Sequence, residues 1–213
     1  MQARLDAQAQ AIVHAAMKVL SEQGFAGLSM AAVAAEAGVA TGTVYKSFSG
    51  KAELVTAVFR DVVTREVAAV AEAGAEGGVV ERVCAAVETF AGRALKNPKL
   101  AYVLLVEPVD AGVDTERLRF RRAFAETFQA AIADGVGTGR LPAQDPRTSA
   151  TALVGAIGEV LVGPLAQGLQ SESVVPELVA FALRALGVTE PAVTGNHRTD
   201  TGADEQEHSD VHP

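Results

Sequence analysis

The sequence predicts an all-α protein, with a small N-terminal bundle of three helices and a larger helical domain behind it. Three observations support this fold class. Alanine, leucine and glutamate, which favour helices, are abundant, and few segments alternate apolar and polar residues as strands do. Apolar residues recur at spacings of three and four, and capping residues or glycines mark the ends of these stretches. With 213 residues, 49% of them hydrophobic, the chain can bury a sizeable core.

The first helix is expected over residues 6–23. Its core-facing residues follow helical spacing: Ile12, Ala15, Ala16, Val19 and Leu20. Gly24 comes next, at the position where a left-handed residue commonly ends a helix.

Two short helices follow. Ser29 is a good N-cap for a helix over 30–37, and Gly38 ends that helix before another begins over 41–48. Two short helices joined by a glycine turn form the helix-turn-helix pattern, and the first helix completes a three-helix bundle.

A long fourth helix is expected over 51–73, and it leaves the bundle to enter the second domain. Two later helices each begin with an N-cap before a proline, at Asn97-Pro98 and Asp145-Pro146. The helices expected in the second domain cover residues 79–95, 98–106, 114–134, 146–163 and 176–186.

The chain therefore divides into a helix-turn-helix domain at 1–50 and a second helical domain at 51–187. An acidic tail, 188–213, lacks apolar periodicity and is expected to be disordered.

The net charge of −8 is unevenly distributed. Residues 188–213 contain six acidic residues and one basic residue, a net charge of −5, which leaves −3 for residues 1–187. Between Val39 and Lys51 the only charged residues are Lys46 and Lys51. The overall acidity is therefore weak evidence against a nucleic-acid-binding surface near the N-terminus.

The cellular compartment follows from what the sequence lacks. Cys84 is the single cysteine, which excludes an internal disulfide and fits a reducing compartment. The first ten residues contain no apolar stretch typical of a signal peptide, and no apolar segment approaches the roughly 20 residues of a membrane span. We expect a cytoplasmic protein that makes no membrane contact.

The segment ATGTVYKSFSGK, residues 40–51, has two lysines and no acidic residue. On a recognition helix, Gly42 would let the backbone approach DNA closely. Thr41 and Thr43 would offer hydroxyl groups to a phosphate or a base.

Three further side chains of this segment suit phosphate contacts. Tyr45 is long enough to reach a phosphate oxygen, Lys46 adds charge beside it, and Lys51 begins the next helix. A structural reading also stands, in which Tyr45 is half-buried in the core and the lysines are solvated surface residues.

The stretch from Ile12 to Phe59, and above all AGVATGTVYKSFSGKAEL within it, resembles the N-terminal DNA-binding domain of the TetR family of one-component regulators. The resemblance implies that helices one to three bind DNA and that an effector-binding, dimerising helical domain follows. It places the DNA-contacting positions at Thr41, Gly42, Thr43, Tyr45, Lys46 and Lys51.

Three positions depart from the family's pattern. Ala40 and Gly50 stand where residues that cap helices three and four are usual, and Ala32 stands where an acid often completes a capping box after Ser29. Each missing cap costs about 1 kcal/mol or less. We expect fewer phosphate contacts but the same fold.

The second domain has one prominent apolar stripe, because Phe120, Phe124 and Phe128 are spaced by four. With Arg93 beside Phe90 on the preceding helix, they suit a cavity for a small, largely apolar effector with one polar or charged end. The residues expected to bind it are Phe90, Tyr102, Val106, Glu107, Arg121, Phe124 and Phe128. Alternatively, the phenylalanines fill a core, and Glu107 and Arg121 pair at the surface.

The segment ATALVGAIGEVLVGPLA is rich in small residues, which suggests close approach of another helix. By the family resemblance, that helix belongs to a second subunit, and residues 176–186 complete a four-helix interface. The interface residues expected are Ala152, Gly155, Ala156, Gly158 and Gly163. Tight packing within one chain is the alternative.

No motif for catalysis or for a cofactor is found, and the four histidines do not form a metal-binding cluster by spacing. We expect a ligand-responsive repressor that binds a palindromic operator as a homodimer, without a metal or cofactor. A helical small-molecule-binding protein without DNA-binding activity is the second hypothesis. Sequence does not separate a repressor from an activator.

Overall fold

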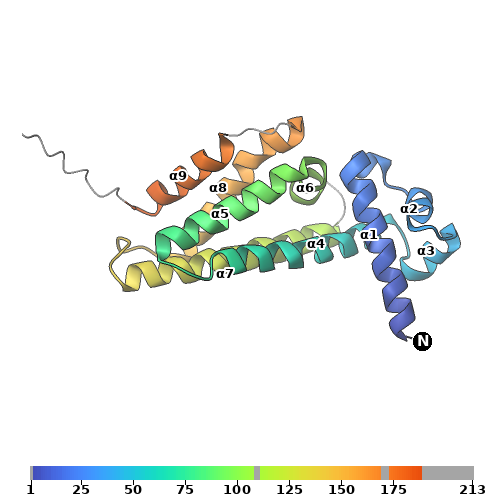
Figure 1. Cartoon of the computed structure of the whole chain (residues 1–213), viewed down its shortest axis with the longest axis horizontal. Helices are drawn as coiled ribbons and strands as arrows, with labels where there is room; N and C mark the ends of the chain where they lie inside the picture. Colours follow the sequence, from blue (N-terminus) through green and yellow to red (C-terminus); the bar gives the residue numbers. More distant parts are fainter. Residues whose placement is uncertain (1, 108–110, 169–172, 189–213) are drawn as a thin grey trace, which may run out of the picture.

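The computed structural model describes residues 2–107, 111–168 and 173–188, and these ranges form helices and no strand (Figure 1). The predicted all-α class is confirmed. The predicted tail, apart from Val188, lies outside the described residues. The helices are α1 (Gln2–Gly27), α2 (Met30–Ala37), α3 (Thr41–Ser47), α4 (Lys51–Ala73), α5 (Val79–Lys96), α6 (Pro98–Leu105), α7 (Ala111–Gly137), α8 (Pro146–Gln167) and α9 (Val174–Ala185).

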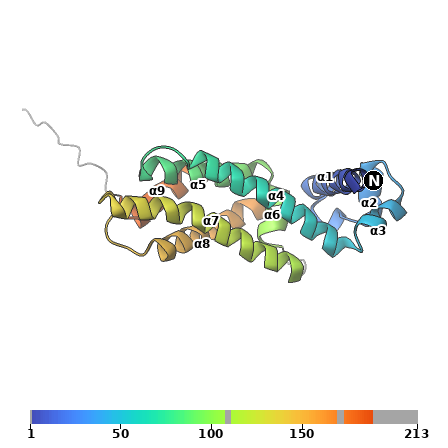
Figure 2. The same ribbon diagram turned by 90° about the horizontal axis from the view of Figure 1, so that it is seen from below.

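The molecule is elongated, with α1, α2 and α3 at one end and α5 to α9 at the other (Figure 1). Helix α4 joins the two parts, because it packs against α1 and also against α5 and α7. Seen from below, α4 and α7 lie side by side along the long axis (Figure 2). Helix α6 contacts both α1 and α8, so it too lies at the junction.

The predicted helix boundaries hold closely in the N-terminal part. Helices α2 and α4 begin and end at the predicted residues, and α3 ends one residue early, with Phe48 as its C-cap. Gly24, with φ of 69° and ψ of −171°, interrupts α1 where the sequence predicted its end. A final turn continues to Gly27.

Capping explains most of these boundaries. The Ser29 hydroxyl accepts from the Ala32 N–H at 3.1 Å, and Gly38 adopts the left-handed conformation, with φ of 65°. Ala40 and Gly50 make no side-chain cap, as expected from their residue types. Glu53 stabilises the start of α4 instead, since its carboxylate accepts from the Ser49 N–H at 2.7 Å and from the Ser49 hydroxyl at 2.6 Å.

The later helices are longer than predicted, except α6, which ends one residue early at Leu105. Helix α7 gains three residues at each end, and α8 continues through Pro164 to Gln167. The Asp145 carboxylate accepts from the Thr148 N–H at 2.7 Å, which confirms the predicted N-cap of α8.

The expectation that no segment is long and apolar enough to span a membrane is wrong for α8. By length and composition alone, this 22-residue helix could span a membrane, because it is rich in glycines, alanines and valines and has few charged residues. Only 28% of its most apolar stretch is buried within the chain. One side of α8 packs on α5, α6 and α7.

Candidate nucleic-acid interface and ligand cavities

Helix α3 has one buried side and one exposed side. Val44 is fully buried and Phe48 is 8% exposed, so both pack into the N-terminal core. Thr41, Gly42, Tyr45 and Lys46 lie on the exposed side, and Thr43 is half-buried beside them. Tyr45 is 54% exposed, which excludes the reading that placed it in the core.

Gly42 has no packing role within the chain. A Cβ atom added there would meet no atom within 4 Å, so the chain itself leaves space for a side chain. A residue without a side chain at this exposed position suits close approach of another molecule to the backbone.

The charges near α3 favour an anionic partner. The only acidic residue between Ser29 and Lys51 is Glu36, and its carboxylate pairs with Lys18 of α1 at 2.7 Å. The hydrogen bond to Glu36 is the main reason that the Lys18 pKa is raised. The pair also joins α1 to α2. The Lys46 side chain, on the exposed side of α3, makes no ion pair in the described part of the chain.

Lys51 has a partner within the chain. Its ammonium donates to the Phe25 carbonyl at 2.8 Å and lies 3.7 Å from the centre of the Phe25 ring. Burial lowers the Lys51 pKa, against a smaller opposing effect of Glu107. In the free protein this lysine joins the start of α4 to the end of α1.

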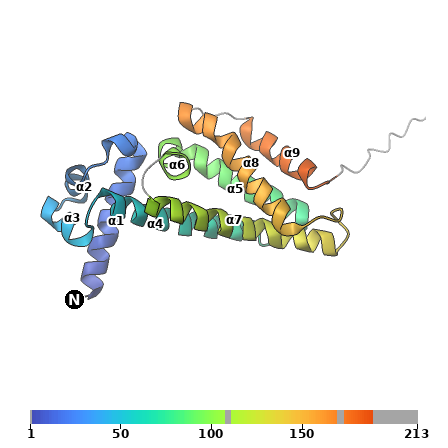
Figure 3. The same cartoon turned by 180° about the vertical axis from the view of Figure 1, so that it is seen from behind.

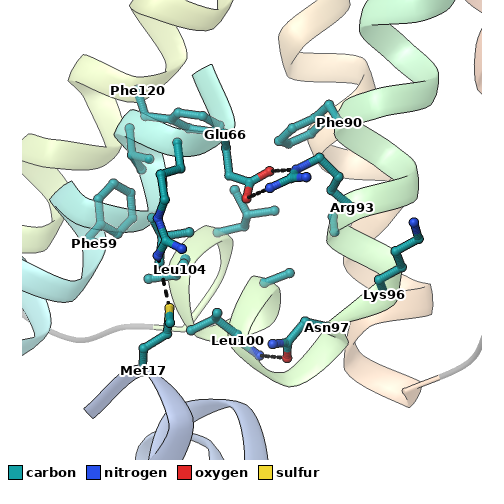
Figure 4. A pocket seen from close by; sticks show the side chains of 16 residues that line it. Met17, Phe59, Glu66, Phe90, Arg93, Lys96, Asn97, Leu100, Leu104 and Phe120 are labelled. Atoms are coloured by element: carbon teal, nitrogen blue, oxygen red, sulfur yellow. Dashed lines mark hydrogen bonds and ion pairs between the residues drawn. The ribbon is translucent and has the colours of Figure 1, made fainter. Parts of the chain in front are cut away.

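A cavity of about 310 Å³ lies where α4, α5, α6 and α7 meet α1 (Figure 4). Met17 lines it from α1, and Asn97 from the end of α5. The largest apolar side chains in its wall are Phe59, Phe90, Leu100, Leu104, Leu105 and Phe120.

Charged groups line one side of this cavity. The Arg93 guanidinium donates to both carboxylate oxygens of Glu66, at 2.5 and 2.8 Å. This hydrogen bonding is the main reason that the Arg93 pKa is raised. Arg65 donates to the Asp61 carboxylate at 2.6 Å and to the Met17 sulfur at 3.2 Å, and Lys96 lines the cavity as well.

A second cavity, of about 300 Å³, lies between the end of α6, α7 and α8. Phe90, Leu105 and Phe120 line both cavities, so one wall separates them. Gly155 and Glu159 of α8 also line the second cavity.

The seven residues predicted to bind the effector divide into two groups. Phe90, Val106, Arg121 and Phe124 line the second cavity, and Phe90 also lines the first. The other three, Tyr102, Glu107 and Phe128, line neither cavity.

The phenylalanines serve both as core and as cavity wall. Phe124 is 1% exposed and lies 4.5 Å from Phe90 and 5.2 Å from Phe128, measured between ring centroids. Phe120 stacks on Phe124 at 5.7 Å.

The suggested surface pair of Glu107 and Arg121 does not form in the described part of the chain. Arg117 occupies the end of α6 instead, where its guanidinium donates to the carbonyls of Val103, Leu104 and Glu107. These bonds satisfy carbonyl groups that a helix end leaves unpaired.

Sequence reasoning missed Met17, Arg65 and Glu66 as cavity residues. A signal was present for Glu66, because it continues the apolar spacing of Phe59, Val62 and Val63 with a charged side chain. Met17 could not be found this way, since its contact with α4 is long-range.

Neither a metal nor a thiol site stands out. In the described ranges, no group of three or more metal-ligating side chains comes together. Cys84 is partly buried, and burial, followed by Glu88 and Glu81, raises its pKa, which disfavours the reactive thiolate.

The small residues of α8 face open space. A Cβ atom at Gly155, Gly158 or Gly163 would meet nothing within 4 Å, so tight packing within one chain does not explain these glycines. Gly155, Gly163 and Ala152 are exposed, and Ala156 is half-buried. Helices α8 and α9 both pack against α5, as Figure 3 shows from behind.

The sequence of the N-terminal part matches a known family. Residues 12–58 fit the model of bacterial regulatory proteins, tetR family. The N-terminal part of the chain is therefore a tetR-family DNA-binding domain. Both the family and the fold are those of DNA-binding transcription regulators, which carry a ligand-binding domain behind the DNA-binding domain and are not enzymes.

Solved structures share the fold of this tetR-family regulator over most of its length. A TetR transcription regulator from Haloarcula marismortui has a TM-score of 0.75 at 18% identity, over 85% of this chain and 97% of that chain. The fatty acid degradation regulator FadR from Bacillus halodurans has a TM-score of 0.73 at 20% identity, over 83% and 94% of the two chains.

FadR from Bacillus subtilis, solved with stearoyl-CoA, has a TM-score of 0.69 at 19% identity, over 84% of this chain and 95% of that chain. At such identities the likeness shows the fold alone. A search of curated protein sequences finds no match.

Proposed function

We propose that the protein is a ligand-responsive repressor that binds a palindromic operator as a homodimer and is released by a small-molecule effector. The carrying observation is the exposed, acid-free side of α3, a helix that packs on α2 and α1, while α1 also lines the larger cavity. Residues 1–50 form the DNA-binding domain and residues 51–187 the effector-binding and dimerisation domain in this proposal. Such a regulator acts on chromosomal DNA in the cytoplasm.

The proposed DNA contacts are the exposed residues of α3. Thr41, Gly42 and Thr43 would meet bases and phosphates at the start of the helix, and Tyr45 and Lys46 would meet phosphates. Lys51 would join them only by exchanging its Phe25 carbonyl for a phosphate oxygen.

Effector binding can reach the DNA-binding domain through short connections. The Asn97 side chain donates to the Ser21 hydroxyl at 2.9 Å, and Lys99 donates to the Glu22 carbonyl at 2.7 Å, so the start of α6 is fastened to α1. Met17 of α1 lines the cavity itself. A ligand that displaces α6 or α4 would therefore shift α1 and the spacing of two recognition helices.

The effector we propose is small and largely apolar. The wall shared by the two cavities is made of Phe90, Leu105 and Phe120, so rotation of these side chains could join the two spaces for a longer ligand. The Bacillus subtilis FadR structure contains stearoyl-CoA, which supports a long apolar ligand for this fold.

A homodimer is proposed through α8 and α9. Val160 of α8 is 49% exposed and Phe181 of α9 is 41% exposed. The glycines of α8 that have open space around them lie on the same helix as Val160. Two subunits would place two recognition helices at half-sites about 34 Å apart.

The test uses a duplex selected from a random-sequence DNA pool. The double variant Tyr45→Ala/Lys46→Ala should lose binding to this duplex, because both side chains are exposed and only DNA contacts are removed. Its melting temperature and oligomeric state should stay unchanged. Unaltered affinity would reject this surface, and failure to select any duplex at low salt would favour a small-molecule-binding protein without DNA-binding activity.

Repression and activation differ in a reporter assay. A promoter carrying the selected duplex should be silenced by the protein, and silencing should be relieved by effector. Increased transcription on adding the protein would instead identify an activator.

A further inference from the structure

We propose that the effector is an anionic amphiphile: an apolar chain whose single carboxylate takes the place of Glu66 at the Arg93 guanidinium. This inference rests on the proposed function, since it names the chemical class of the ligand for the larger cavity. It is carried by the Glu66–Arg93 pair, by the charges around it and by the size of the space.

The Glu66–Arg93 pair already displays carboxylate recognition at the cavity wall. Glu66 reaches across from α4 and Arg93 from α5, and the two meet in a two-pronged arrangement over the cavity (Figure 4). Both carboxylate oxygens of Glu66 are bound, which is the geometry in which arginine recognises planar anions. A ligand carboxylate would find the same donors in the same positions.

Exchange of Glu66 for a ligand is feasible because the pair is partly exposed. The Arg93 side chain is 45% exposed and that of Glu66 is 24% exposed. Ion pairs this exposed contribute little to stability, and a released Glu66 can turn towards water. The ligand therefore has to displace one solvated carboxylate, and no buried charge is stranded.

The balance of charge favours an anion over a cation. Three basic residues, Arg65, Arg93 and Lys96, line the cavity, against one acidic residue, Glu66. Asp61, which pairs with Arg65, does not line it. The Lys96 side chain makes no hydrogen bond or ion pair to any residue in the part of the chain that the structure describes. A carboxylate would reduce this positive excess, whereas an ammonium would increase it.

The volume sets the length of the chain. A cavity of roughly 150 Å³ holds one benzene molecule, with six non-hydrogen atoms. The cavity of about 310 Å³ should therefore hold about twelve. Decanoate, with about this number of atoms, is a suitable probe, and its apolar chain would lie against Phe59, Leu100 and Leu104.

The experiment compares decanoate, decanol and decylamine by isothermal titration calorimetry against the full chain. Decanoate should bind at least about tenfold more tightly than decanol, the size expected for charge-assisted hydrogen bonds. Decylamine should bind more weakly than decanol. Equal affinities for decanoate and decanol, or tightest binding of decylamine, would overturn the inference.

Variants locate the head group. Arg93→Gln should reduce decanoate affinity about tenfold or more and leave decanol affinity within about twofold. Glu66→Gln removes the competing carboxylate, so it should strengthen decanoate binding. Arg122→Gln, which removes one exposed positive charge of α7 outside both cavities, is the matched control. It should change neither the decanoate affinity nor the decanol affinity.

The selected DNA duplex separates this inference from the proposed function. A chain that selects a duplex but shows no preference for decanoate is a regulator with a different ligand, and the inference fails alone. A chain that binds decanoate through Arg93 but selects no duplex leaves the inference intact and removes the repressor. An Arg93→Gln variant that binds decanoate as well as the original chain refutes the exchange directly.

Discussion

The glycines of α8 allow a prediction in which the sign of the effect distinguishes an exposed helix from a subunit interface. Within the chain, a methyl group at Gly155 would contact nothing within 4 Å. Replacing a glycine by alanine inside a helix then stabilises the fold by about 0.8–1.0 kcal/mol. For a chain of this size the melting temperature should rise by about 2–4 °C.

Gly92 of α5 provides the control. It too has no atom within 4 Å of an added Cβ, and it lies outside the proposed interface. Gly92→Ala should therefore show the full stabilisation and leave the dimer unchanged. If it does not stabilise the protein, the helix-propensity argument itself is wrong.

Gly155→Ala behaves differently if a second subunit packs there. An extra methyl group in a close helix contact costs about 1–3 kcal/mol, and two-fold symmetry places it in the interface twice. The loss of about 2–6 kcal/mol raises the dimer dissociation constant by at least about thirtyfold. Gly155→Leu should enlarge this effect.

Sedimentation velocity over a dilution series measures the dimer constant, and calorimetry at high and low protein concentration measures the melting temperature. The monomer of Gly155→Ala should be more stable than the original monomer, and its dimer weaker. A dimer constant that is the same for Gly92→Ala and Gly155→Leu would show that this side of α8 is not the interface.

Three further predictions concern contacts that join the helices. Lys51→Met should lower the free energy of unfolding by about 1 kcal/mol, since the variant loses the hydrogen bond to the Phe25 carbonyl. The slope of log DNA affinity against log salt concentration should become shallower by about one only if this lysine also contacts a phosphate. Glu116→Gln should lower the free energy of unfolding by about 1–2 kcal/mol, because this buried carboxylate pairs with Arg60 of α4 at 2.7 Å. An unchanged midpoint of denaturant unfolding would show that the pair does not contribute to stability. Glu53 has a pKa below its ordinary value because Ser49 donates to its carboxylate, so its contribution to stability is present above pH 4.5 and is lost as the pH falls through the lowered pKa. The stability gap between the original chain and Glu53→Gln, measured by denaturant unfolding over a pH series, should narrow as the pH falls below 4.5, and a constant gap would contradict this.

The bounds of α2 and α3 were predictable almost residue by residue, whereas α1 extends four residues beyond its predicted range at each end. Helices α2 and α3 are short, and residues with strong local preferences, such as the Ser29 cap and the left-handed Gly38, mark the ends of α2. Local preferences act within a few residues, so they can be recognised without knowing the tertiary fold. The burial of Val44 likewise follows from helical spacing, whereas the exposure of Tyr45 was left open by the sequence and decided by the structure.

The ends of the second-domain helices were less predictable. The predicted end of α8 was residue 163, but the helix continues through Pro164 to Gln167, because packing on α6 and α7 outweighs the lost hydrogen bond. Apolar composition alone also did not reveal that so much of α8 stays uncovered.

The proposed effector site illustrates the same limit at the level of side chains. Helical spacing identified Phe90 and Phe124, since each lies on the buried side of its helix. It did not distinguish Phe124, which lines a cavity, from Phe128, which fills the core. Nor did it bring Glu66 to Arg93 or Met17 to Arg65, because these pairs join residues 27 and 48 positions apart.

The sequence alone determined the helical fold, the helix-turn-helix pattern and the exposed, weakly basic side of α3, because local propensity and charge decide these features. Only the tertiary structure decided where space remains between the helices and which charges meet there. Cavities and long-range ion pairs depend on how several helices cross, and crossing geometry is set by the packing of many side chains together.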